Sequence, residues 1–223
     1  MKKNISYLIL SFFTMIMTYS VKAEVSLIEI QHEWAKANYE TPENQQEKIF
    51  EQLVLKAREL VSSQPSKAEP KVWLAIVVST QAGVTGGLGA LGKVKEAKVL
   101  LEEAEKIDPK VLDGSIYTSL GSLYYQVPGW PIGFGKNSKA EEYLQKALTL
   151  NPDGIDPNYF YGDFMLEEGK VIKAIEYLKK AQAAPPRSDR PLADKGRQKE
   201  IAMKLAEAEQ KQKSSGKKNV FQK

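Results

Sequence analysis

Asp163 and Glu167 are the residues of this sequence whose type and spacing come nearest to acid–base chemistry. They lie four positions apart, so a helix would place both carboxylates on one face, as a general acid and base require. The same spacing is common between charged residues on helix surfaces, and neither a nucleophile nor a set of metal ligands accompanies the pair. We therefore expect no catalysis and no cofactor.

Other kinds of chemistry lack the residue types that they need. The 223 residues include no cysteine and one histidine, His32. Glu29, Glu33 and Trp34 lie near it in the sequence. The lack of cysteine excludes disulfides, thiol nucleophiles and cysteine-based zinc clusters. We interpret His32 as a residue of the surface or of a packed chain end.

A glycine-rich segment, 84–93, contains the spacing of a nucleotide-binding loop. Gly87, Gly89 and Gly92 satisfy the dinucleotide fingerprint, and Lys93 nearly completes a phosphate loop. However, a phosphate loop needs Ser or Thr after the lysine to bind magnesium, and here Val94 follows. The apolar segment before the glycines also has the pattern of a helix rather than of a strand. We therefore do not expect a nucleotide site.

Charge is distributed unevenly along the chain. The formal net charge is +4, but eight lysines and no acidic residue lie within the segments 1–23 and 211–223, so residues 24–210 carry a net negative charge. A folded domain of that sign is a poor binder of polyanions. We expect no nucleic-acid partner.

The first 23 residues have the features of an export signal. Lys2 and Lys3 precede an apolar stretch, and a small residue, Ala23, ends it, which predicts a signal peptide over 1–23. The alternative is an uncleaved anchor, because the uncharged segment 4–21 is of borderline length for a bilayer. Without cysteine, lipid attachment through a lipobox is impossible. We expect a soluble periplasmic protein with no membrane insertion after cleavage.

Internal repeats determine the expected architecture. A shift of 34 residues places 139–152 on 173–186, and a shift of 43 residues places 79–113 on 122–156, with many identities in both registers. These shifts define three units, 71–113, 114–155 and 156–186.

Each unit has the pattern of two helices. The second helix carries small or apolar residues at i, i+3, i+4 and i+7, as in Ala140, Tyr143, Leu144 and Ala147, and a proline ends it. The first helices are expected over 72–82, 115–126 and 157–168.

Two details of the first helices carry specific expectations. Gly121 and Gly162 in mid-helix suggest close helix crossings, since glycine otherwise costs about 1 kcal/mol there. Asp156 is expected to cap the helix over 157–168, in which Pro157 takes the first helical position.

These repeats resemble the tetratricopeptide repeat. Residues 71–186 carry the resemblance, through the early aromatics Trp73 and Tyr117, the Leu-Gly and Tyr-Gly pairs ending at Gly121 and Gly162, and the Ala-Leu-Ala-Pro series. The resemblance implies an all-α solenoid of helical hairpins with three to four repeats and a C-terminal capping helix. Residues 24–70 would form a degenerate first repeat or cap.

The C-terminal part is expected to close the stack and then become irregular. Residues 187–210 read as the capping helix, with Asp189 capping it before Pro191 and with Arg190 and Asp194 one turn apart as structural bracing. Residues 211–223 are expected to form a disordered basic tail. The chain also looks like exported proteobacterial repeat proteins and is more loosely similar to the helical repeat component of TRAP-type solute transporters.

One candidate binding site lies at the glycine-rich linkers 84–93 and 127–136. Equivalent linkers of stacked units should meet at one edge, where Trp130 and Phe134 could line a small pocket with Leu88 and Leu91. Alternatively, these apolar side chains only cover the helix ends beneath them.

The second candidate site is the wall formed by the first helices. The chaperone-binding branch of the family uses lysines and asparagines there to hold a peptide carboxylate. This wall is expected to be hydroxyl-bearing, aromatic and acidic, so we do not expect a peptide carboxylate as its ligand. Such a wall suits a basic or polar peptide, or a cationic ligand. A solvated helix face is the alternative. The residues concerned are Ser115, Thr118, Ser122, Tyr125, Gln126, Asp156, Tyr159, Asp163 and Glu167.

These features together predict a non-catalytic periplasmic scaffold that binds an envelope protein or peptide. The alternative is a small-solute binding accessory of a transport system, with its pocket at the glycine-rich loops.

Overall fold

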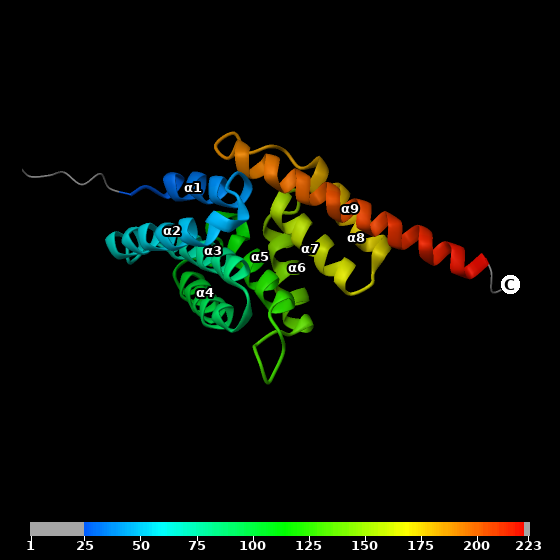
Figure 1. Cartoon of the computed structure of the whole chain (residues 1–223), viewed down its shortest axis with the longest axis horizontal. Coiled ribbons are helices and arrows are strands. Elements are labelled where there is room, and N and C mark those ends of the chain that lie inside the picture. Colours follow the sequence, from blue (N-terminus) through cyan, green and yellow to red (C-terminus); the bar gives the residue numbers. More distant parts are fainter. Residues whose placement is uncertain (1–24, 221–223) are drawn as a thin grey trace, which may run out of the picture.

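The computed structural model describes residues 25–220, and within this range it is all-α (Figure 1). The expected signal peptide, 1–23, lies outside the described residues. The helices are α1 (Leu27–Tyr39), α2 (Glu43–Ser63), α3 (Ala68–Thr85), α4 (Gly87–Ile107), α5 (Val111–Gln126), α6 (Asn137–Leu150), α7 (Ile155–Glu167), α8 (Val171–Ala183) and α9 (Pro191–Val220).

The three predicted units appear as the antiparallel hairpins α3/α4, α5/α6 and α7/α8, and α1/α2 precede them. The small residues of the second helices are the reason that each hairpin packs closely. Ala97, Ala140 and Ala174 are fully buried where α4, α6 and α8 meet their partner helices. A methyl side chain at these points lets two helix backbones approach, while larger neighbours fill the adjacent space.

The mid-helix glycines mark the predicted close crossings. A Cβ placed on Gly121 would lie 2.5 Å from Cγ of Leu144, and one on Gly162 would lie 2.8 Å from Cγ of Leu178. Both leucines belong to the second helix of the same unit and are fully buried. The helices therefore touch at positions that no larger residue could occupy without displacement.

The linker 84–93 differs from its expected structure. Gly86, with φ of 64° and ψ of −175°, and Gly87, with φ of 55°, make the turn between α3 and α4, and α4 begins at Gly87. Most of the glycine-rich segment is therefore helix, which rules out an extended loop. Only 127–136 remains a true loop between the helices of a unit.

The start of α5 agrees with expectation, whereas the cap of α7 does not. Leu112, Asp113 and Gly114 have left-handed backbone angles, so the regular part of α5 begins near Ser115, as the sequence predicts. Asp156 does not cap α7, whose N-cap position is Gly154. Its carboxylate is instead occupied by two arginines from the C-terminal segment.

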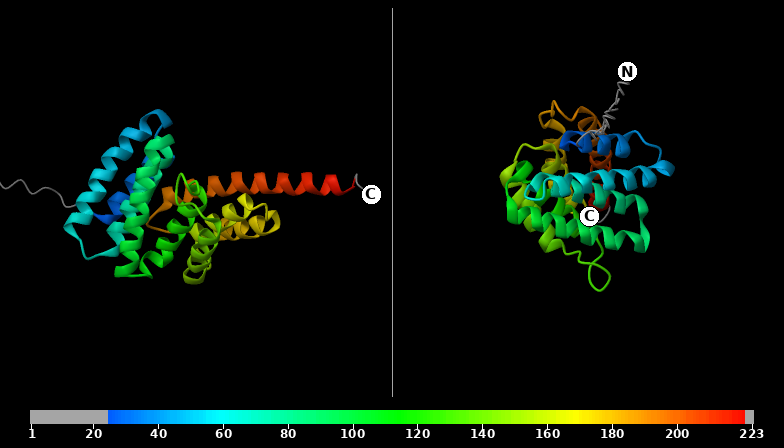
Figure 2. Two further views of the ribbon diagram at one scale, coloured as in Figure 1. Left: turned by 90° about the horizontal axis from the view of Figure 1, so that it is seen from below. Right: turned by 90° about the vertical axis from the view of Figure 1, so that its left-hand side faces the viewer.

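The last helix closes the stack and continues beyond it (Figures 1 and 2). α9 packs on α8 and α7 and also reaches α1, so that the two ends of the solenoid meet. The expectation of a disordered tail from 211 is wrong for the described residues, because α9 extends to Val220. No helix of the described range combines the length and apolar character needed to cross a membrane.

Candidate ligand-binding cavity

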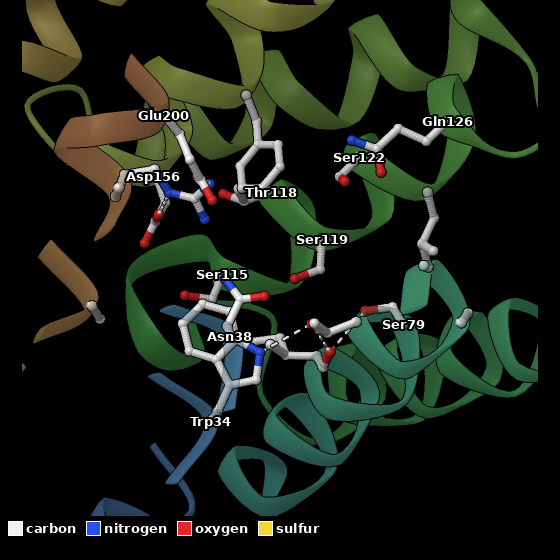
Figure 3. A pocket seen from close by; sticks show the side chains of 18 of the residues that line it. Trp34, Asn38, Ser79, Ser115, Thr118, Ser119, Ser122, Gln126, Asp156 and Glu200 are labelled. Atoms are coloured by element: carbon white, nitrogen blue, oxygen red, sulfur yellow. Dashed lines mark hydrogen bonds and ion pairs between the residues drawn. The ribbon is translucent and has the colours of Figure 1, made fainter. Parts of the chain in front are cut away.

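The concave side of the solenoid holds a half-open cavity of about 1500 Å³ (Figure 3). The first helices α3, α5 and α7 form its wall, and residues of α1, of the segment 185–190 and of α9 close it where the ends of the chain meet. The cavity thus exists because α9 returns to α1.

A polar stripe runs along the α5 side of the cavity. Ser115, Thr118, Ser119, Ser122 and Gln126 follow the i, i+3, i+4, i+7, i+11 spacing that keeps residues on one helix face. Ser115 donates a hydrogen bond to the carbonyl of its own helix start at 2.7 Å. The stripe offers uncharged donors and acceptors over about 16 Å, given a rise of 1.5 Å per residue.

Two tryptophans form part of the opposite side. Trp34 of α1 donates from Nε1 to Oγ1 of Thr80 at 2.9 Å, and its ring meets Trp73 edge-to-face with centroids 5.9 Å apart. Both rings are nearly buried and also line the cavity. Their packing and the hydrogen bond hold the apolar part of the lining rigid.

Charged residues gather where α7 meets the C-terminal segment. Asp156 accepts from Nη1 of Arg187 at 2.7 Å and from Nε of Arg197 at 2.9 Å. Arg187 also binds Asp194, and Arg197 binds Glu200. Burial would raise the pKa of Asp156, but Arg197 and Arg187 outweigh it and hold that pKa well below its usual range.

Several residues predicted for the first-helix wall are covered by α9. Asp163 forms an ion pair with Lys204 of α9 at 2.7 Å and accepts from the Tyr125 hydroxyl at 2.7 Å. The guanidinium carbon of Arg197 lies 4.4 Å from the centroid of the Tyr159 ring, so that α9 covers this ring as well. Glu167 is exposed. None of these four predicted residues lines the cavity, whereas Ser115, Thr118, Ser122, Gln126 and Asp156 do.

Asp163 is buried and contacts other side chains, whereas Glu167 is exposed. Burial raises the pKa of Tyr125, and the adjoining Asp163 raises it further, so the hydrogen bond from this phenol to the carboxylate is retained at neutral pH. Asp163 is thus engaged by Lys204 and Tyr125. Within residues 25–220, no three His, Cys, Asp or Glu side chains are grouped so as to hold a metal ion.

The predicted pocket of Trp130, Phe134, Leu88 and Leu91 is not assembled. Trp130 is 90% exposed at the tip of the 127–136 loop, and Phe134 packs edge-to-face on Tyr124 with centroids 5.4 Å apart. Leu88 and Leu91 line the large cavity instead, although Leu88 is 86% exposed. Residues of both linkers, Leu88 and Leu91 of the first and Ile132 of the second, line the same large cavity, but Trp130 and Phe134 do not.

Sequence reasoning missed the residues that α1 and the C-terminal segment contribute. Trp34, Trp73 and Arg190 line the cavity, yet Trp34 and Arg190 lie outside the repeats and Trp73 was assigned only to the repeat pattern. The sequence signal was the density of charge from Arg187 to Arg197, where three arginines alternate with two aspartates. Only the return of α9 to α1 gives these residues a common site.

Comparisons with known proteins give the following similarities. A tetratricopeptide-repeat family model matches residues 132–153, which include α6. Two crystal structures of MamA are similar, with TM-scores of 0.43 and 0.42, identities of 20% and 19%, and coverage of 76% and 86% of this chain and 92% and 94% of theirs. The Pseudomonas aeruginosa pilF structure has a TM-score of 0.34 and 18% identity, covering 84% of this chain and 90% of that one. No curated protein matches the sequence.

Proposed function

Since the chain is a tetratricopeptide-repeat protein, we propose that it is a non-catalytic scaffold of the cell envelope that binds a polypeptide segment in its central cavity. The observation that carries this proposal is the cavity itself, which the first helices line with an uninterrupted polar stripe on α5. Serine, threonine and glutamine side chains suit the carbonyl and amide groups of an extended backbone.

The size of the cavity favours a polypeptide over a small solute. Pockets for small molecules have volumes of roughly 300–1,000 Å³ and enclose most of their ligand, whereas this cavity measures about 1500 Å³. At about 3.3–3.6 Å per extended residue, the α5 stripe is long enough for four or five residues. The alternative of a small-solute binding accessory placed its pocket at the glycine-rich loops. Trp130 and Phe134 do not line a pocket together there.

A capture experiment with matched variants tests the binding site. Ser119→Trp would fill the middle of the cavity, while Gln145→Trp places the same side chain on an exposed position of α6 outside it. Immobilised wild type and Gln145→Trp should retain the same proteins from an envelope extract, and Ser119→Trp should lose them while its circular dichroism spectrum is unchanged. Equal retention by all three proteins would refute binding in the cavity.

The location in the envelope rests on the predicted signal peptide 1–23. The full-length chain, fused to a reporter that is active only after export, should give a signal that disappears when residues 2–23 are deleted. The mature form is then expected in the periplasmic fraction, beginning at Glu24. A reporter that stays inactive with the full-length chain would refute the envelope proposal and leave the polypeptide-binding proposal standing.

A further inference from the structure

The three most exposed large apolar side chains of the described residues all lie where the two helices of a hairpin are joined. Trp130, in the loop before α6, is 90% exposed, Leu88, the second residue of α4, is 86% exposed, and Ile172, the second residue of α8, is 75% exposed. Each of the three hairpins therefore presents one large apolar side chain to solvent at its turn. Single exposed apolar residues are common, but a row of them at equivalent places indicates an interaction surface.

The three turns are neighbours along one edge of the solenoid. Nζ of Lys98 in α4 lies 5.9 Å from the centroid of the Phe134 ring in the 127–136 loop. Asn137, at the start of α6, donates a hydrogen bond at 2.6 Å to Oε1 of Glu168, just before α8. The loop projects from the body of the protein (Figure 1). We call this surface the turn edge, and it comprises residues 86–98, 127–139 and 167–173.

The projecting loop is held in one shape although its tip is exposed. The backbone N–H groups of Ile132 and Gly133 both donate to the carbonyl of Gly129 at 3.1 Å, and that of Lys136 donates to the carbonyl of Tyr124 at 2.8 Å. The Trp130 ring is thus presented to solvent on an ordered backbone. Because the backbone is already fixed, burying this ring against a partner costs less conformational entropy than it would on a flexible loop.

The turn edge is positively charged, although residues 24–210 as a whole carry a net negative charge. It contains seven lysines and three carboxylates. Of the carboxylates, Glu96 and Glu168 form ion pairs with Arg58 and Lys170, and Glu167 is exposed. Four of the lysines have no ion pair among the described residues, namely Lys93, Lys95, Lys136 and Lys173.

We propose that the turn edge binds the surface of a membrane that contains anionic lipids. This inference goes beyond polypeptide binding in the cavity and does not depend on it. Tryptophan favours the headgroup level of a bilayer, and lysines are attracted to anionic lipids, so the two features of this edge act together. A bilayer also accepts separate projecting apolar side chains without matching pockets, whereas a protein partner would need a pocket for each of them.

Vesicle flotation measures this binding directly. The chain from Glu24 onward contains every described helix and lacks the segment 1–23, whose apolar stretch would itself enter a bilayer. It should bind vesicles made of equal parts phosphatidylcholine and phosphatidylglycerol at least about tenfold more tightly than vesicles of phosphatidylcholine alone, because several lysines each contribute roughly fivefold.

Tryptophan fluorescence identifies the part of the chain that enters the lipid. Trp34 and Trp73 are nearly buried, so a change on binding reports Trp130. Its emission should move to shorter wavelength on anionic vesicles and should be quenched by lipids with brominated acyl chains.

Matched variants separate the apolar contribution from general stickiness. Trp130→Ser and Leu88→Ser should each weaken binding to anionic vesicles about tenfold. Leu55→Ser removes an exposed leucine from the middle of α2 and should leave the binding unchanged. Circular dichroism verifies that each variant is folded.

A second pair of variants tests the charge. Lys136→Gln combined with Lys173→Gln removes two exposed lysines at the starts of α6 and α8 and should weaken binding by at least about tenfold. Lys106→Gln combined with Lys110→Gln makes the same change in net charge at the other end of α4, and its effect should be less than about twofold.

Three results would overturn the membrane proposal and leave the cavity proposal standing. The first is a failure of wild type to bind anionic vesicles. The second is binding that Trp130→Ser and Leu88→Ser weaken no more than Leu55→Ser does. The third is equally tight binding to both kinds of vesicle, which would remove the role of the lysines. Capture of a protein that depends on Trp130, without any vesicle binding, would assign the turn edge to a protein partner instead.

Discussion

Gly196 of α9 lies directly on the aromatic ring of Tyr39 at the end of α1, so close that a Cβ on Gly196 would be 2.4 Å from three ring carbons. The side chain of Tyr39 in turn packs edge-to-face on Trp34, with centroids 5.7 Å apart. This contact joins the two ends of the solenoid, and the cavity is closed because of it.

One added methyl group at Gly196 should weaken the contact between α9 and α1. Gly196→Ala should force the Tyr39 ring to move and destabilise the fold by about 1–3 kcal/mol, with faster amide exchange in α1. Gly83→Ala is the matched control, since nothing lies within 4 Å of a Cβ there. Hydrogen exchange measured by mass spectrometry would contradict the role of this contact if α1 exchanged equally in both variants.

The close crossing inside the central repeat gives a second prediction. Gly121→Ala places a methyl group 2.5 Å from Leu144, which is fully buried and cannot retreat freely. We expect a loss of about 1–3 kcal/mol in the free energy of unfolding. Gly92→Ala in α4, where a Cβ would meet nothing within 4 Å, should be neutral or stabilising by up to about 1 kcal/mol. Urea unfolding of the two variants decides the matter, and equal stabilities would show that the crossing is not tight.

Asp156 makes stability depend on pH at the acidic end. Its pKa is lower in the folded chain than in the unfolded one, so the ionised carboxylate stabilises the fold above pH 4, approximately its unfolded pKa, and this contribution is lost as the pH falls further. Asp156→Asn should cost about 3 kcal/mol at pH 7, and the difference from wild type should shrink steadily between pH 4 and pH 2.

The control for this effect is Asp153→Asn, which removes the same charge from an exposed residue of the turn before α7 that has no ion pair among the described residues. It should change stability by less than about 0.5 kcal/mol at either pH. If Asp156→Asn and wild type kept a constant difference across the titration, the ion pairs with Arg187 and Arg197 would not be the source of the stabilisation.

Trp130 should contribute little to stability. With 90% of its surface exposed, Trp130→Ala is expected to shift the free energy of unfolding by less than about 0.5 kcal/mol. Trp34→Ala, which empties a buried position and breaks the hydrogen bond to Thr80, should cost about 3–5 kcal/mol. Thermal denaturation followed by circular dichroism compares them. A large loss with Trp130→Ala would mean that the loop tip packs on the body.

The sequence predicts the repeated hairpins because their information is local. The periodic alanines of α4, α6 and α8 and the glycines at 121 and 162 report packing between neighbouring helices, and both are visible as spacing. The return of the C-terminal segment to α1 joins residues about 157 positions apart, as in the hydrogen bond between His32 and the carbonyl of Asp189, just before α9. No periodic signal encodes such a contact. The sequence therefore does not predict that α9 covers Asp163 and Tyr159.

The linkers show a related limit. Both are glycine-rich and share Gly86, Gly92 and Lys93 with Gly129, Gly135 and Lys136 in the 43-residue register, but their backbones differ. In 127–136, Gly135 lies against the Val127 carbonyl so closely that a Cβ would be 1.8 Å from its oxygen, which holds a compact loop. In 84–93, Gly86 at φ of 64° and Gly87 at φ of 55° make the turn, and the following residues are helical. Glycine-rich segments at equivalent positions therefore predict a break between helices but not its shape.

The most direct test of polypeptide binding in the cavity is site-specific photo-crosslinking in cells that make the protein. A photoreactive phenylalanine analogue replaces Ser119 inside the cavity or, as the control, Gln145 on the exposed side of α6. The account predicts that Ser119 yields a discrete adduct, which mass spectrometry maps to one short segment of a partner polypeptide, and that Gln145 does not. An adduct from Gln145 alone, or the same adducts from both positions, would contradict polypeptide binding in the cavity.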